Sequence, residues 1–401
     1  METTVTDSLY AARMNVIPKS FIREILKVTE DPQIISFAGG LPNPRFFPTE
    51  EIAQAAAAVL TGADGAPLQY STTEGYGPLR EFIAQRYRDK RGLDISPDEV
   101  LVTNGSQQAL DLICKVFVGP GDAIAIERPA YLGAIQAFSV YEPQFCPVPL
   151  LDDGVDLEQL KAVLDRQRLK FFHTVINFQN PSGLSYSAEK RAQLAELLAP
   201  YDTVVLEDDP YAELRFEGTA APSMRSWLEG RVILMGSFSK IVAPGLRLGW
   251  VCAQREIMNK LVVAKQASDL HSNSLCQRML HHYLTHNDVD RHIATINAAY
   301  GNQRKVMIEA IEAHCPAEVK FTRPQGGMFL WMTLPSQLKA VELFERAVGQ
   351  RVAFVPGTPF FVDGGGVHNM RLNFSNADED RISVGIRRLG TIMKEMLARP
   401  Q

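Results

Sequence analysis

Between residues 100 and 251 the chain alternates short apolar runs with amphipathic stretches, and this pattern restricts the fold more than any other feature. Short buried strands separated by helices are typical of a mainly parallel central sheet covered by helices, an α/β fold. We expect helices at 107–116 and 188–198, and Ser187 is placed to cap the second one. The candidate strands are 100–103, 123–126, 171–176, 203–206, 232–235 and 246–252.

The pattern changes after Asn287, where a long helical stretch runs to about residue 313. Strand-like segments at 319–334 and 370–374 and a last amphipathic stretch at 380–397 then predict a smaller α+β domain. We therefore expect a large domain at 46–286 and a small domain at 287–401. Residues 1–45 are expected to join the small domain.

The strongest chemical signal is the segment 237–249, which directly follows an apolar run. Lys240 lies near Arg247, and Ser237 and Ser239 add hydroxyl donors. A buried lysine near another cation has a partly neutral, nucleophilic amine, while an arginine supplies a fixed charge for a phosphate. Taken alone, such a pair is most simply a solvated strand end. The Pro244-Gly245 turn and the companion motifs favour a nucleophilic lysine.

Two further motifs end predicted strands, at the edge of the sheet where open α/β proteins bind ligands. The first is the run Glu207-Asp208-Asp209-Pro210-Tyr211. Either Asp208 or Asp209 could supply the carboxylate that contacts a ligand there. The second is the turn 177–183, which contains Asn180. By itself this second segment is only a good turn.

The segment 104–110 joins a strand to a helix, so Ser106 and Gln107 lie where a phosphate meets backbone N–H groups and the helix dipole. An ordinary helix cap by Ser106 is the alternative. Tyr131 follows the next strand and is either a ligand contact or a core tyrosine.

In this order, the motifs resemble those of fold-type I aminotransferases, which use pyridoxal 5′-phosphate. The segments 36–42, 236–240 and 326–329 place the resemblance nearest the 2-aminoadipate, aromatic and kynurenine branch. It implies that Lys240 holds the cofactor and moves the substrate Cα proton in a ping-pong exchange between an L-amino acid and a 2-oxo acid such as 2-oxoglutarate. The other cofactor contacts that it implies are Ser106, Gln107, Tyr131, Asn180, Asp208, Tyr211, Ser237, Ser239 and Arg247.

The resemblance also implies the substrate contacts. Arg371 matches the arginine that binds the α-carboxylate, a bidentate task suited to a guanidinium. Gly39 and Gly40, together with Asn180, match positions beside the substrate. Arg23 matches a position that selects acidic or apolar side chains, although an exposed helix charge is an equal alternative. Tyr70 matches a tyrosine that completes the partner's site in a homodimer.

Composition narrows the remaining choices. The formal net charge is −5 and no long basic run occurs, so we expect no nucleic-acid partner. No apolar run is long enough for a membrane span, and no leader sequence opens the chain, so we expect a cytoplasmic protein. The five cysteines lack metal-ligand spacing, and we expect no metal.

Two other functions remain open from the sequence. A lyase or decarboxylase on the same scaffold would keep Asp208 and Arg371. A regulator that only senses the cofactor would carry an additional DNA-binding domain, and only about thirty residues precede the first motif.

Overall fold

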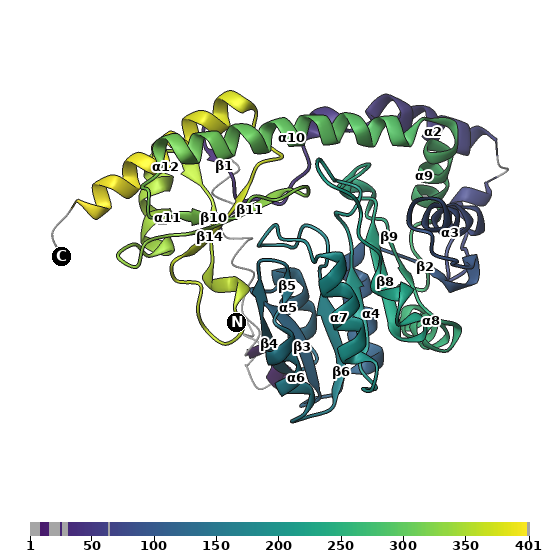
Figure 1. Cartoon of the computed structure of the whole chain (residues 1–401). Helices are drawn as coiled ribbons and strands as arrows, with labels where there is room; N and C mark the ends of the chain where they lie inside the picture. The colour runs from purple at the N-terminus through teal and green to yellow at the C-terminus, as the bar shows by residue number, and fades with distance from the viewer. Residues whose placement is uncertain (1–8, 16–24, 26–30, 63–64, 399–401) are drawn as a thin grey trace, which may run out of the picture.

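A computed structural model describes residues 9–15, 25, 31–62 and 65–398, and an eight-stranded sheet forms its centre (Figure 1). The strand order is β2-β9-β8-β7-β6-β3-β4-β5. The strands are β2 (Val100–Thr103), β3 (Ala123–Arg128), β4 (Gln144–Leu151), β5 (Gly154–Val155), β6 (Leu169–Thr174), β7 (Val204–Asp208), β8 (Val232–Ser237) and β9 (Gly249–Cys252).

Five neighbouring strands, β8, β7, β6, β3 and β4, run parallel to one another. Strand β9 is antiparallel to both of its neighbours, and β5 is antiparallel to β4. The predicted mainly parallel sheet is therefore confirmed. Its carboxyl-terminal edge gathers the segments that follow β3, β6, β7 and β8.

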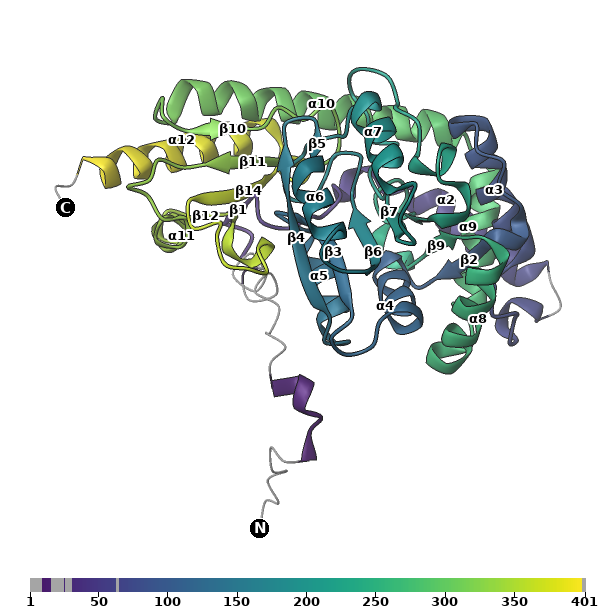
Figure 2. The ribbon, with the colours of Figure 1, turned by 60° about the horizontal axis from the view of Figure 1, so that its bottom comes forward.

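Helices pack on both faces of the sheet and close an apolar layer on each. Helices α4 (Ser106–Phe117), α5 (Leu132–Ser139) and α8 (Arg255–Asp269) lie along the sheet in Figure 2. They cover strand residues such as Ile124, Leu206 and Met235. The opposite face, with Ala125 and Val205, is covered by α3 (Gly77–Arg91), α6 (Leu157–Leu164), α7 (Ala188–Leu198) and α9 (Ser274–His286). Alternate strand residues therefore face opposite layers.

A second, antiparallel sheet has the order β10-β11-β14-β13. Its strands are β10 (Lys320–Phe321), β11 (Phe329–Thr333), β13 (Val355–Pro356) and β14 (Asn369–Asn373). Helices α10 (Val289–His314), α11 (Ala340–Gly349) and α12 (Glu379–Leu397) belong to the same part of the chain, and α10 extends from this sheet toward α2 (Thr49–Thr61) (Figure 1). Strand β1 (Ile35–Ser36) pairs in parallel with β12 (Val352–Ala353), which ties residues 35–36 to this second unit.

Local chemistry sets several boundaries near the ligand-binding edge. The Ser187 Oγ accepts a hydrogen bond of 3.0 Å from the Lys190 N–H, which confirms the expected cap of α7. Helix α4 instead begins after Gly105, whose φ of +75° places it outside the usual cap conformation. Ser106 is thus the first helical residue, and the alternative that it caps α4 is wrong.

The structure corrects one strand prediction and adds one strand that the sequence does not predict. The strand expected at 246–252 begins only at Gly249, because residues 244–246 form a 3₁₀ turn and Arg247 has a φ of +53°. Strand β4 was not expected at all, and it contains Pro147 and Pro149, which lack the N–H that a strand normally donates. No helix in the described part of the chain is both long and apolar enough to cross a membrane.

Candidate active site

A cavity of about 430 Å³ opens at the carboxyl-terminal edge of the large sheet. Its size suits a small cofactor with part of a substrate. Three cations and one carboxylate line it, so it favours a ligand with anionic groups. The lining residues are Gly40, Ser106, Gln107, Tyr131, Gln136, Val175, Asn180, Asp208, Pro210, Tyr211, Ser237, Ser239, Lys240, Arg247, Phe329 and Arg371.

Fold topology explains why residues distant in the sequence meet here. Asp208 is the last residue of β7, and Lys240 follows the end of β8 by three positions. Asn180 lies in the turn after β6. Parallel strands bring these ends to one edge. Arg371 comes from β14 of the second sheet, so the cavity lies between the two units.

One end of the cavity is built around the start of α4. An ideal Cβ on Gly105 would lie 2.7 Å from Arg247 Nη2, so only glycine lets the guanidinium approach the helix terminus. Arg247 Nη2 donates to the Asn104 carbonyl at 3.3 Å. Ser106, Ser237 and Arg247 therefore surround a helix N-terminus, an arrangement that binds phosphate well.

A buried lysine, Lys265, holds together the polar side chains near the start of α4. Lys265 Nζ donates to Gln108 Oε1 at 2.9 Å and to both Asp269 carboxylate oxygens at 3.0 Å. Asp269 also accepts from the Asn104 side chain at 2.6 Å. Because each charge is paired, the network fixes the backbone at the start of α4 without adding charge to the cavity.

Among the residues that the structure describes, Asp208 is the only one whose carboxylate lines the cavity. One oxygen, Oδ2, lies 3.3 Å from His173 Nε2, and both side chains are buried. Its other oxygen, Oδ1, is buried and has no hydrogen-bond partner among the described residues. A buried acceptor without a partner is costly, so this atom is ready to accept a donor from a ligand.

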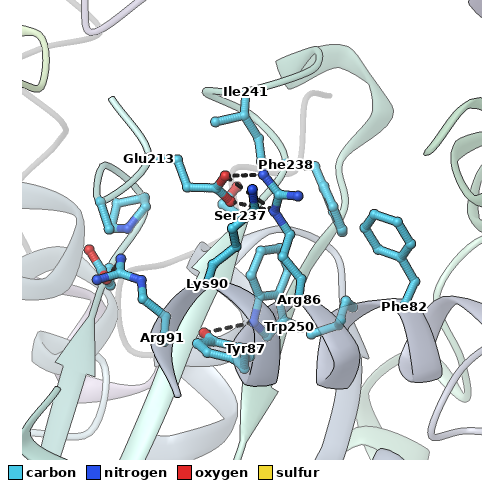
Figure 3. Close-up of a pocket in the computed structure, with 14 residues that line it drawn as sticks. Phe82, Arg86, Tyr87, Lys90, Arg91, Glu213, Ser237, Phe238, Ile241 and Trp250 are labelled. Carbon is cyan, nitrogen blue, oxygen red and sulfur yellow. Dashed lines mark hydrogen bonds and ion pairs between the residues drawn. The ribbon is translucent and has the colours of Figure 1, made fainter. Parts of the chain in front are cut away.

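Asp209, the competing candidate, belongs to a different cavity of about 60 Å³ behind the site. Its carboxylate pairs with Arg91 at 3.0 Å. Figure 3 shows Arg86 and Glu213 bonded to each other in this second cavity, and the Trp250 indole N–H donates to the Tyr87 hydroxyl at 3.1 Å. Asp209 Oδ1 is buried without a hydrogen-bond partner among the described residues, but Asp209 does not line the main cavity.

Lys240 lines the main cavity, and its Nζ donates to the Gly40 carbonyl at 2.8 Å. Burial lowers the pKa of its amine to about 8, and the positive charges of Arg371 and Arg247 contribute in the same direction. A usable fraction of the amine is therefore neutral near physiological pH, as a nucleophile or base requires.

Arg371 is only 2% exposed and has no carboxylate partner among the described residues. Nη1 donates to Asn180 Oδ1 and Nη2 to the Ala38 carbonyl, each at 2.7 Å, while Nε is buried without a partner. Its Cζ lies 4.3 Å from the centre of the Phe329 ring. Burial lowers the pKa of Arg371 to about 10. A buried cation of this kind favours an incoming anion.

Two tyrosines complete the walls. The Asn180 amide donates to the Tyr211 hydroxyl at 3.3 Å. Burial raises the pKa of Tyr131 to about 12, so its hydroxyl stays protonated. A Cβ on Gly133 would lie 2.5 Å from the Tyr131 ring, and this glycine therefore leaves room for the ring.

Two sequence candidates, Tyr70 and Gly39, do not line this cavity, and a third, Arg23, cannot be placed relative to it. Tyr70 is 79% exposed, and its ring meets that of His271 edge-on at 5.9 Å. Gly39 is buried next to Ala38, which accepts from Arg371. Arg23 lies outside the described residues.

The sequence did not indicate several lining residues, nor His173, which supports Asp208. Pro210 and Phe329 lay inside recognised motifs, and their proximity to Asp208 and to the 326–329 segment was the available signal. Gln136 and Val175 carried no motif. His173 looked like an ordinary strand residue, because its contact with Asp208 joins two different strands.

The lining residues fit pyridoxal 5′-phosphate. The Gly105–Arg247 end suits the phosphate, the unpartnered Asp208 oxygen suits a protonated ring nitrogen, and Lys240 lines the same cavity. The fold and this site define a pyridoxal-phosphate enzyme of fold type I.

The comparisons with known proteins agree. The family model for aminotransferase class I and II matches residues 36–389. The chain is 45% identical to a 2-aminoadipate transaminase from Thermus thermophilus over 95% of this chain and 96% of that protein. It is 42% identical to an aromatic-amino-acid aminotransferase from Thermococcus litoralis over 94% and 92%.

Structural comparison gives the same result. An α-aminoadipate aminotransferase from Thermus thermophilus, complexed with N-(5′-phosphopyridoxyl)-L-leucine, superposes with a TM-score of 0.91, 42% identity and 98% coverage of both chains. The chain belongs to the class I and II aminotransferase family, and it is a pyridoxal-phosphate aminotransferase.

Proposed function

We propose that this aminotransferase moves the amino group of an L-amino acid of the 2-aminoadipate, aromatic, or branched or other aliphatic type to a 2-oxo acid such as 2-oxoglutarate. The observation that carries this proposal is that Lys240 and Arg371 line the same cavity. Lys240 supplies a partly neutral amine, and Arg371 supplies a buried cation with no carboxylate partner among the described residues.

When bound, pyridoxal phosphate supplies an aldehyde that joins covalently to amines and a ring that accepts electrons from the substrate Cα. We propose that Lys240 holds the cofactor and that Tyr131 stacks on its ring. Asp208 would accept a hydrogen bond from the ring nitrogen, and Asn180 and Tyr211 would donate to the phenolic oxygen. The phosphate would contact Ser106, Gln107, Ser237, Ser239 and Arg247.

Lys240 then acts as a base and an acid in turn. When it is not holding the cofactor, its neutral Nζ would take the proton from the substrate Cα, and the protonated amine would give that proton back to complete the exchange. The cations Arg371 and Arg247 favour the neutral amine, because a second positive charge nearby is unfavourable.

Arg371 would bind the α-carboxylate of both substrates through a bidentate pair. Its existing bonds to Asn180 and the Ala38 carbonyl orient the guanidinium plane. Gly39 and Gly40 lie in the segment that passes beside this arginine, and we propose that their backbone contacts the substrate.

Two further proposals concern which substrates the enzyme selects and how its subunits assemble. We propose that Arg23 swings toward acidic side chains. We also propose a homodimer in which Tyr70 reaches the phosphate of the partner's cofactor, and the exposure of Tyr70 supports this role.

The domain bounds and the cellular location stay predictions. They are a large domain at 46–286, a small domain at 287–401, a joining segment at 1–45 and a cytoplasmic location.

Product analysis tests the proposed function. The purified enzyme should convert 2-oxoglutarate and a suitable amino acid into equal amounts of glutamate and the new 2-oxo acid. Lys240→Ala should abolish turnover, while Lys161→Ala, which removes an exposed lysine paired with Asp165, should retain it. Release of carbon dioxide or ammonia without stoichiometric glutamate would contradict transamination.

A further inference from the structure

One carboxylate outside the cavity accepts an unusual number of hydrogen bonds. Glu127, near the end of β3, is 1% exposed. Its Oε1 accepts from the Thr174 hydroxyl at 2.7 Å, the Val175 N–H at 3.1 Å and the Tyr186 hydroxyl at 2.8 Å. Its Oε2 accepts from Gln179 Nε2 at 2.9 Å.

No lysine or arginine pairs with this carboxylate among residues 31–62 and 65–398. Burial raises the pKa of Glu127, and the hydrogen bonds from Thr174 and Gln179 oppose that rise. A buried charge is expensive unless it is well hydrogen-bonded, and a nonpolar side chain would fill the position at lower cost. This arrangement therefore points to a role beyond stability.

The bond to Gln179 fixes the direction of that side-chain amide. An ionised carboxylate can only accept, so Gln179 turns its NH₂ group toward Glu127 and its oxygen away. The same NH₂ donates to the Pro129 carbonyl at 2.9 Å. The oxygen accepts from the Ser182 N–H at 2.7 Å and so closes the turn that contains Asn180.

Two cofactor-facing segments are thus joined to one carboxylate. Asn180 directly follows Gln179 and contacts both Arg371 and Tyr211. Pro129, held by the same amide, lies two residues before Tyr131. Glu127 itself does not line the cavity, so any effect that it has on the cofactor is indirect.

We propose that Glu127 is a positioning residue that, through Gln179, holds Asn180 against the phenolic oxygen of the cofactor and holds the segment that carries Tyr131. This inference rests on the proposed cofactor-binding mode. A donor at the phenolic oxygen stabilises its deprotonated form, so the alignment of Asn180 sets the pKa of the bound cofactor's chromophore.

Glu127→Gln tests the proposal, because it preserves the shape of the side chain but adds a donor. The new NH₂ faces existing donors, and a rotation of the Gln179 amide to meet it would leave the Ser182 N–H without an acceptor. We expect the dissociation constant for pyridoxal phosphate to rise about tenfold, the effect of one weakened hydrogen bond. The chromophore pKa, measured by absorbance titration of the loaded enzyme, should rise as well.

Tyr186→Phe is the matched control. It removes another donor to the same carboxylate, but Tyr186 does not contact Gln179 or Asn180 through any hydrogen bond of the described residues. It should lower the unfolding temperature, because one buried hydrogen bond is lost. The dissociation constant for pyridoxal phosphate should stay within about twofold of wild type, and the chromophore pKa should not change.

Gln179→Met provides a second test that leaves the other three donors on Glu127. It should reproduce the loss of affinity and the change in chromophore pKa even if Glu127→Gln fails to fold. Wild-type affinity and chromophore pKa in Gln179→Met, or in a folded Glu127→Gln, would overturn the inference. A wild-type enzyme without any cofactor absorbance would instead overturn the proposed function.

Discussion

Replacement of Arg371 by lysine should separate substrate binding from cofactor binding. The guanidinium holds Asn180 and the Ala38 carbonyl while its plane still faces the cavity. A lysine ammonium keeps the positive charge, but it lacks the planar fork of donors that can hold Asn180 and the Ala38 carbonyl and also bind a carboxylate. Loss of one charge-assisted hydrogen bond costs about 1.5–3 kcal/mol, so KM for the amino acid should rise about 10- to 150-fold.

Steady-state kinetics with the amino acid, the 2-oxo acid and the corresponding amine that lacks the α-carboxylate would measure this effect. KM should rise for both acids, while the slow reaction of the amine and the affinity for pyridoxal phosphate should change little. Arg225→Lys is the control, because Arg225 is a buried arginine that pairs with Glu99 away from the cavity. Equal losses for the acid and the amine would refute the role of Arg371.

Three further changes test other parts of the site. Asp208→Asn should still bind pyridoxal phosphate but lower kcat at least about a hundredfold, because a neutral amide holds a ring proton poorly; a near-normal single-turnover rate would contradict this role. Gly105→Ala should cost about 1–3 kcal/mol of unfolding free energy, since its φ of +75° with ψ of 171° suits glycine alone, and should weaken cofactor binding through Arg247; denaturant titration and cofactor titration measure both. Capture of pyridoxal phosphate by the cofactor-free enzyme should accelerate as pH rises through about 8, because the lowered pKa of Lys240 releases the neutral amine there; a rate that does not change with pH would contradict that assignment.

Much of the fold could be predicted because local patterns and tertiary packing agree. Strand β2 and helix α7 have the predicted ends, where the apolar run and the Ser187 cap leave little choice. Strand β4 escaped prediction because its two prolines argue against a strand. Strand β9 starts late because the left-handed conformation of Arg247 depends on its packing over Gly105.

The sequence could indicate the residues that line the site better than the residues that support them. Most residues that line the cavity lie in recognisable motifs near strand ends, so the sequence could indicate them, whereas Gln136 and Val175 lie in no motif. The residues that support them could not be found, because their contacts join distant segments: His173 meets Asp208 across two strands, and Glu127 meets Gln179 and Tyr186 more than fifty positions away. Their residue types are also common in strands and turns, which leaves no chemical signal.

The most direct test of the account is chemical identification of the lysine that holds the cofactor. The enzyme loaded with pyridoxal phosphate would be treated with borohydride, digested and analysed by peptide mass spectrometry. The account predicts the phosphopyridoxyl group on Lys240, in the peptide that also contains Ser237 and Ser239. Stoichiometric labelling of a different lysine, with Lys240 unmodified, would contradict it.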